Sequence, residues 1–235
     1  MRGNGRMVAG VLAGSLTGLA AGLAMADNFR GPEWVEEGDA GSLPGGAQNT
    51  TGEGPLGALR GMLGIGFGQP DAEDMYWIRI DNPSQFSART LSPGFAQFDS
   101  QLWLFRANGL GLLANDDAPD SESGESLLLP LANDGTNARV DRPGLYLLAI
   151  TIFNNDPFSK GGPIFTQDLR TEISGPDGPG GSLRIIGWSD NRGEGSGQLE
   201  YRIMLTGASF ANLPAPGVLG VFALAGLMKR RRRSE

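Results

Sequence analysis

The sequence predicts an all-β protein with the architecture of an antiparallel β-sandwich. Short segments in which apolar residues alternate with polar ones recur through the middle of the chain, which is the pattern of half-buried strands. The 235 residues include 38 glycines and 15 prolines, which interrupt this region at short intervals. Apolar periodicity typical of helices is weak there, so short strands joined by tight turns account best for the pattern.

Seven segments carry a strand pattern, the first of them more weakly than the rest. In chain order these segments are residues 56–65, 75–81, 101–106, 126–131, 145–153, 183–188 and 199–206. In the third segment Leu102 and Leu104 are expected on the face opposite Trp103 and Phe105, because successive side chains of a strand point to opposite faces. The continuous apolar run at 145–153 predicts a central strand that is covered on both faces.

The chain divides into four parts by composition. We expect a signal peptide at 1–26, a flexible acidic and glycine-rich leader at 27–54, the sandwich domain at 55–210, and a sorting or anchor segment at 213–235. The domain has a length that suffices for one substantial core. Both terminal parts are expected to form helices outside the sandwich.

The N-terminal part has the layout of a secretory signal peptide. Arg2 and Arg6 provide a positive region, residues 7–23 are apolar, and Ala24 and Ala26 form a small-x-small cleavage site. We expect signal peptidase to cut here, so that the chain is exported. The alternative is an uncleaved N-terminal anchor.

The C-terminal part combines a proline pair, a short apolar run at 218–228 and a cationic end. The residues concerned are Pro214, Ala215 and Pro216, followed after the apolar run by Lys229, Arg230, Arg231, Arg232 and Arg233. As a helix, 213–228 would cover roughly 24 Å, which is short for a bilayer core of about 30 Å. The cations favour the cytoplasmic face of a membrane.

This layout resembles the PEP-CTERM sorting signal of Gram-negative bacteria, although Ala215 stands where that motif usually has glutamate. The resemblance implies an exosortase-like membrane processing enzyme as a partner. It also implies contact with the membrane through the C-terminal segment before processing. The destination would be the cell envelope, the outer surface or the extracellular matrix. The alternative is an ordinary transmembrane anchor that is never cut.

Composition excludes several kinds of chemistry. The chain contains no histidine and no cysteine, so a Ser-His-Asp triad, a cysteine nucleophile, a typical zinc site and disulfides are ruled out. The terminal parts hold seven of the 19 Lys and Arg residues and one of the 26 Asp and Glu residues. The remainder therefore has 12 cations and 25 anions, a net charge of about −13. That charge disfavours nucleic acid and favours cations as partners.

Seven short motifs follow one another across residues 35–208. They are residues 38–44, 74–76, 98–105, 115–117, 143–150, 187–188 and 201–207. In this order they resemble the bacterial pre-peptidase C-terminal (PPC-like) domain. The resemblance implies a jelly-roll-like β-sandwich, which in that family is an accessory module of secreted proteins. The collagen-binding relatives in that family hold calcium.

An acidic group forms a candidate calcium site. Asp99 opens one predicted strand, and Asn115, Asp116 and Asp117 form the turn after the next one. If 101–106 and 110–114 pair as a hairpin, these residues fall at the same end of it. Calcium takes six to eight oxygen ligands from such groups. The resemblance implies that the leader acids Glu37 and Asp39 reach over to complete the site. The alternative is a simple polar turn.

Three tryptophans form a second candidate site. Trp77, Trp103 and Trp188 offer ring faces that could stack on sugars, although core packing is the commoner role for such residues. Taken together, the sequence predicts a non-catalytic exported protein that calcium helps to stabilise. The alternative is an extracellular module that binds carbohydrate, such as extracellular polysaccharide, or protein. A secreted hydrolase built on paired carboxylates is the less favoured third reading.

Overall fold

The structure is a computed structural model that describes residues 31–65, 71–91, 99–189 and 197–214. The signal peptide with Ala24 and Ala26, and the tail from Ala215 onward, lie outside these ranges, so the two expected terminal helices do too. The described residues contain one short 3-10 helix, η1 (Pro83–Gln85), and are otherwise strands and loops. No helix among them is long and apolar enough to span a membrane.

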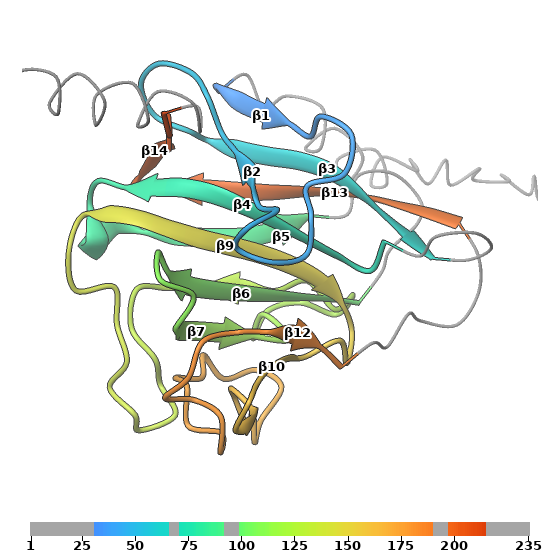
Figure 1. Cartoon of the computed structure of the whole chain (residues 1–235), viewed down its shortest axis with the longest axis vertical. Helices are drawn as coiled ribbons and strands as arrows, with labels where there is room; N and C mark the ends of the chain where they lie inside the picture. Colours follow the sequence, from blue (N-terminus) through green and yellow to red (C-terminus); the bar gives the residue numbers. More distant parts are fainter. Residues whose placement is uncertain (1–30, 66–70, 92–98, 190–196, 215–235) are drawn as a thin grey trace, which may run out of the picture. The chain divides into compact units, whose positions relative to one another are not determined.

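Fourteen strands are found in the described part of the chain (Figure 1). They are β1 (Glu33–Val35), β2 (Gln48–Asn49), β3 (Ala58–Ile65), β4 (Glu73–Ile80), β5 (Ser87–Leu91), β6 (Ser100–Arg106), β7 (Gly111–Asn115), β8 (Leu127–Leu128), β9 (Gly144–Ile152), β10 (Pro157–Ser159), β11 (Gly162–Pro163), β12 (Gly187–Trp188), β13 (Gly197–Thr206) and β14 (Ala208–Phe210). The prediction of an all-β protein is confirmed.

The strands form two large sheets and one small sheet. The first large sheet has the order β1-β3-β13-β5-β8, and the second has the order β14-β4-β9-β6-β7 with β2 added beside β4. The small sheet has the order β11-β10-β12. Most neighbours are antiparallel, but β1 pairs with β3 and β2 pairs with β4 in parallel. The sheets are therefore mixed but mainly antiparallel, which is consistent with the predicted β-sandwich.

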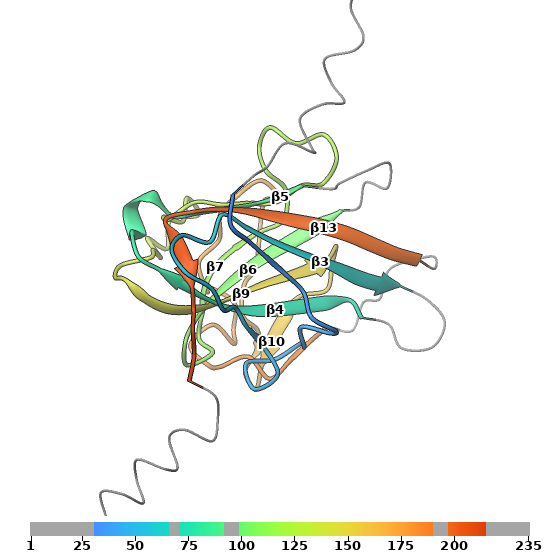
Figure 2. The same cartoon turned by 90° about the horizontal axis from the view of Figure 1, so that it is seen from above.

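The two large sheets face each other, as Figure 2 shows from above. They share an apolar core. One sheet contributes Leu59 and Ile203, and the other contributes Ile78, Leu104 and Leu148, all of them fully buried. These side chains come from alternate positions of their strands, because only every second residue points between the sheets. The sandwich is thus built by the alternation that the sequence shows.

A second core lies on the outer face of the larger sheet. Trp103 and Phe105 of β6 point there and pack against Phe165 and Trp188 of the segment that carries the small sheet. Their neighbours Leu102 and Leu104 point into the first core, as predicted. Strand β9 is likewise covered on both faces, so the prediction of a central strand at 145–153 is confirmed.

Two predicted strands are shorter than expected. Of residues 126–131 only β8 is a strand, and of residues 183–188 only β12 is one. Leu131 and Leu183 are 50% and 44% exposed, so apolar character there does not indicate a buried strand. Strand β5 was not predicted. Its sequence Ser-Ala-Arg-Thr-Leu buries only small side chains, Ala88 and Thr90, against the first core.

The leader also differs from the prediction. Strands β1 and β2 lie within it, each paired with a strand of a large sheet. The indole Nε1 of Trp34 donates a hydrogen bond to Oε1 of Gln48 at 2.7 Å, and Ala40 is fully buried. The described part of the leader, residues 31–54, is therefore integrated into the sandwich rather than a flexible extension of it.

Candidate metal centre

Three carboxylates converge where β6 begins and β7 ends. The two strands pair antiparallel, with Leu102 opposite Asn115, so the residue before β6 and the residues after β7 share one end of the hairpin. One carboxylate oxygen each of Asp99, Asp116 and Asp117 lies within 4.8 Å of the other two. The structure thus brings together the three acids that the sequence predicted, and we name them the Asp116 cluster.

The environment of Asp116 is unusual for an acid. The residue is only 4% exposed, and its carboxylate makes no hydrogen bond or ion pair with the described residues. Burial raises its pKa to about 7, and the charges of Asp117 and Asp99 add to the increase. Burial raises the pKa of Asp99 as well, and Oδ1 of Asp99 also lacks a partner among the described residues. Buried acceptors without donors are costly, so the site favours a bound cation.

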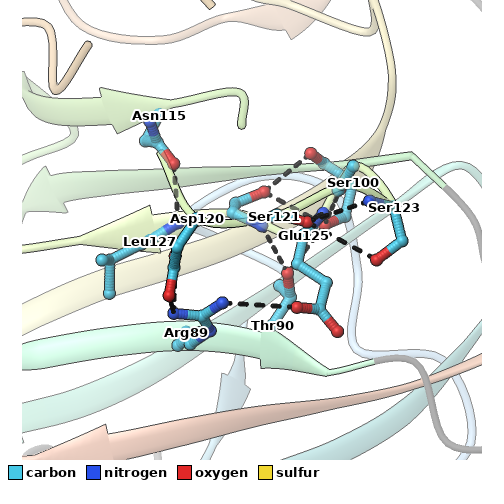
Figure 3. Close-up of polar contacts among 11 residues, drawn as sticks. Arg89, Thr90, Ser100, Asn115, Asp120, Ser121, Ser123, Glu125 and Leu127 are labelled. Atoms are coloured by element: carbon cyan, nitrogen blue, oxygen red, sulfur yellow. Dashed lines mark hydrogen bonds and ion pairs between the residues drawn. The ribbon is translucent and has the colours of Figure 1, made fainter. Parts of the chain in front are cut away.

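Asn115 has a different role from the one predicted. Its Nδ2 donates to the backbone oxygens of Asp117 at 3.0 Å and Glu172 at 2.9 Å. Its Oδ1 accepts a hydrogen bond from the backbone N–H of Leu127 at 2.6 Å (Figure 3). The amide is therefore occupied with backbone groups, and it shapes the turn that presents the two aspartates.

The loop that follows the cluster is held by side-chain contacts of its own (Figure 3). Ser121 Oγ accepts hydrogen bonds from the backbone N–H groups of Ser123 and Glu125 at 3.2 and 3.0 Å. Arg89 of β5 forms ion pairs with Asp120 at 3.0 Å and Glu125 at 3.5 Å. These contacts fix the loop without any contribution from the three clustered acids.

Glycine is required where this loop passes Asp99. Gly124 has a φ of 74°, which side chains rarely tolerate, and a Cβ there would lie 2.7 Å from Oδ1 of Asp99. Nearby, Ser100 Oγ is 2.8 Å from Thr90 Oγ1 and 3.0 Å from Ser126 Oγ, and all three residues are buried. The carboxylates are therefore positioned by a packed and hydrogen-bonded scaffold.

A second acidic group, which the sequence analysis missed, lies at the start of β4. One oxygen each of Glu36, Asp71 and Asp74 lies within 4.8 Å of the other two. We name these residues the Asp74 cluster. The available signals were the Asp-x-x-Asp spacing before a strong strand pattern and the position of Glu36 next to the predicted ligand Glu37.

Asp74 is fully buried between the two large sheets. Its Oδ2 accepts a hydrogen bond from the hydroxyl of Tyr201 at 2.6 Å, and that hydroxyl is 2.5 Å from the hydroxyl of Tyr76. Its Oδ1 has no hydrogen-bond partner among the described residues. Burial, followed by the charges of Glu36 and Asp71, raises the pKa of Asp74 well above its usual value.

The second cluster is crowded by further negative charge. Burial raises the pKa of Asp71 to about 7, and the charges of Asp39 and Glu36 contribute. Strand β3 can lie this close to Tyr201 and Glu36 only because residue 61 is glycine. A Cβ there would collide with the Tyr201 hydroxyl and lie 2.7 Å from Oε2 of Glu36. The leader acid Asp39 thus acts on the Asp74 cluster and not on the Asp116 cluster.

The predicted leader ligands are placed accordingly. Asp39 acts electrostatically on Asp71, and Glu37 is exposed, with its backbone N–H bonded to Oε1 of Gln48 at 3.1 Å. Within the described ranges, neither belongs to the group formed by Asp99, Asp116 and Asp117. The expectation that the leader completes the Asp116 cluster is therefore corrected.

The tryptophans are mainly core residues. Trp103 is fully buried and Trp188 is 8% exposed, and their rings meet edge to face at 6.1 Å. The indole Nε1 of Trp103 donates to Thr151 Oγ1 at 2.9 Å, and that of Trp188 donates to the backbone oxygen of Ser42 at 2.7 Å. Trp77 is partly buried against the same core. Neither Trp103 nor Trp188 has a free ring face for a sugar, so stacking remains a prediction for Trp77 alone.

No protein-family model matches the chain, and a search of curated proteins returns no match. The assignment of function therefore depends on the residues described above.

The raised pKa values of Asp116 and Asp71 predict that, without a divalent cation, stability falls as pH rises. Both carboxyls titrate near 7 when folded, against about 4 when unfolded. Between these values the folded state binds more protons, so the free energy of unfolding decreases with increasing pH. We expect the Tm in chelator to drop by several degrees between about pH 5 and pH 8, at about 2–4 °C per kcal/mol.

Thermal melts of the wild type and of Asp116→Asn check this expectation. The substitution removes one titrating group, so the variant should lose less Tm over the same range. Glu53→Gln, at an exposed acid, should follow the wild type. A wild-type Tm that is constant or rises over this range would contradict the assignment.

Proposed function

We propose that the chain is a non-catalytic exported protein whose β-sandwich is stabilised by calcium at the Asp116 and Asp74 clusters. The observation that carries this proposal is Asp116. It is a 4% exposed carboxylate without a hydrogen bond to the described residues, and it faces two further carboxylates. A divalent cation would reduce the repulsion between the three carboxylates and would provide the buried oxygen of Asp116 with an interaction partner.

Calcium fits the donors better than other common metals. Both clusters offer only carboxylate oxygens, and the sequence has no histidine or cysteine to supply nitrogen or sulfur ligands. Hard oxygen donors in irregular arrangements suit calcium, which tolerates variable geometry, whereas magnesium requires a near-ideal octahedron. Backbone carbonyls and water would complete the coordination.

The finer assignments of fold and address belong to the same proposal. The domain is a jelly-roll-like sandwich of the PPC-like kind, with a signal helix before it and a short apolar helix after it. Signal peptidase removes residues 1–26, and an exosortase-like enzyme reads Pro214, Ala215 and Pro216. The product is then held at the cell envelope or in the extracellular matrix. The charge pattern of the two ends supports this address.

A second candidate function is an adhesion module for acidic polysaccharide or protein. The observation that favours it is a groove of about 380 Å³, whose apolar lining includes Leu110, Leu183 and Ile186 and whose cations are Lys160 and Arg184. Neither cation has a carboxylate within 4.0 Å among the described residues. Binding to arrays of acidic glycans would distinguish this function from a purely structural one.

Calcium should raise the thermal stability of the wild type. An ion that binds only the folded state adds about 2.7 kcal/mol at a hundredfold excess over Kd, which is about 5–10 °C in Tm for each site. Replacing Asp116→Asn together with Asp117→Asn should remove the part of the increase that comes from the Asp116 cluster. Differential scanning calorimetry in calcium and in chelator measures both effects.

The matched control for this experiment is Glu53→Gln together with Asp81→Asn. It removes the same charge from two exposed acids outside both clusters and should keep the full calcium response. Identical melting of the wild type in calcium and in chelator would show that neither cluster binds calcium, and the proposal would fail.

The mature protein should lack both terminal segments. The signal-peptide layout and the proline pair before the cationic tail motivate this expectation. The intact mass of the protein purified from its native host tests it, with a mass that corresponds to cleavage near Ala26 and near Pro216 as the expected result. A mass equal to that of residues 1–235 would refute the proposed address.

A further inference from the structure

Arg170 is held beside the Asp116 cluster by its backbone. The N–H of Asp117 donates a hydrogen bond to the carbonyl oxygen of Arg170 at 2.8 Å. Two residues further on, the carbonyl oxygen of Glu172 accepts a hydrogen bond from Nδ2 of Asn115 at 2.9 Å. Neither contact involves the arginine side chain, so the residue stays next to the cluster whichever way its guanidinium points.

The guanidinium reaches only the outer edge of the cluster. Its Nη1 lies 3.4 Å from Oδ2 of Asp117, and the arginine side chain is 70% exposed. In contrast, Oδ1 of Asp116 and Oδ1 of Asp99 are buried and without a hydrogen-bond partner among the described residues. The single charge of Arg170 thus meets one carboxylate and leaves the inner oxygens of the other two unsatisfied.

The guanidinium of Arg170 and a divalent ion would therefore compete for the carboxylate of Asp117. A divalent ion that binds the three acids takes Asp117 as a ligand and places two positive charges near the guanidinium. Because the arginine is solvent-exposed and makes one long ion pair, its side chain can leave at little cost. Its positive charge nevertheless acts on the cluster. Burial raises the pKa of Asp99 and of Asp116, and the charge of Arg170 offsets part of that increase.

We propose that Arg170 is a tethered competitor that sets the affinity of the Asp116 cluster for divalent cations. This inference rests on the proposed function of the cluster as a cation site. Arg170 partly neutralises the empty cluster and must give up Asp117 when the ion enters. The site is thereby tuned to fill only where the cation is abundant, as it is outside the cell, and to empty again when the cation is removed.

The test is isothermal titration of the folded full-length protein with calcium chloride alone, at low salt and about pH 7.5. Arg170→Gln should bind calcium about three- to tenfold more tightly at the Asp116 cluster, because one nearby positive charge is gone. Arg170→Lys keeps the charge and should stay close to the wild type. The signal of this cluster is identified as the one lost in Asp116→Asn with Asp117→Asn.

Arg142→Gln is the matched control. Arg142 is 72% exposed and lies 4.0 Å from Asp141, so its replacement changes the net charge equally but at another site. It should leave calcium affinity unchanged. If Arg170→Gln binds calcium as the wild type does, or more weakly, Arg170 is not a competitor and this inference is overturned while the cation site stands.

A wild type without any calcium signal that depends on Asp116 and Asp117 would overturn both the cation site and the role of Arg170. Near-ultraviolet circular dichroism confirms that each variant is folded before titration. The two failures are thus distinguishable, since one abolishes binding in the wild type and the other only removes the difference between the variants.

Discussion

The larger sheet is covered by apolar side chains on both of its faces, and this constraint determines where charge can lie. Strand β9 packs against the opposite sheet through Leu148 and Ile150, and against the aromatic core through Leu147 and Ala149. Charged side chains in the middle of such a strand would be buried without solvent. The acids of the neighbouring strands are therefore found at the strand ends and in the adjoining turns.

Strands β4 and β6 flank β9 and run parallel to each other, so their first residues reach the same end of it. Asp74 lies opposite Ile150, and Ser100, which follows Asp99, lies opposite Ile152. Each acid there meets two more from a turn or from the leader. The scaffold of glycines, hydroxyls and backbone hydrogen bonds holds them in place even though their charges repel. A bound cation would turn this local cost into a stabilising contribution.

The sequence alone predicted the features that depend on local pattern. Alternation in β6 predicted its two faces correctly. The positions of Asp99, Asp116 and Asp117 at the two ends of a hairpin were sufficient to predict that they meet. Features that depend on distant contacts were not predictable. The side chain of Asn115 forms hydrogen bonds with the backbone of Leu127 and Glu172, and the leader pairs with β3 and β4. No local sequence pattern reveals these contacts. Trp103 shows the same limit, because its position in a strand does not tell whether a third layer covers it.

If the two clusters are cation sites of the folded protein, each chain must bind a fixed number of ions, and that number can be measured. Equilibrium dialysis against calcium at about pH 7.5 and physiological salt, followed by measurement of calcium and of protein, gives the stoichiometry. We expect two calcium ions per chain in the wild type and one in the variant that lacks the carboxylates of Asp116 and Asp117. A wild type that retains no calcium above the dialysis buffer would contradict this expectation.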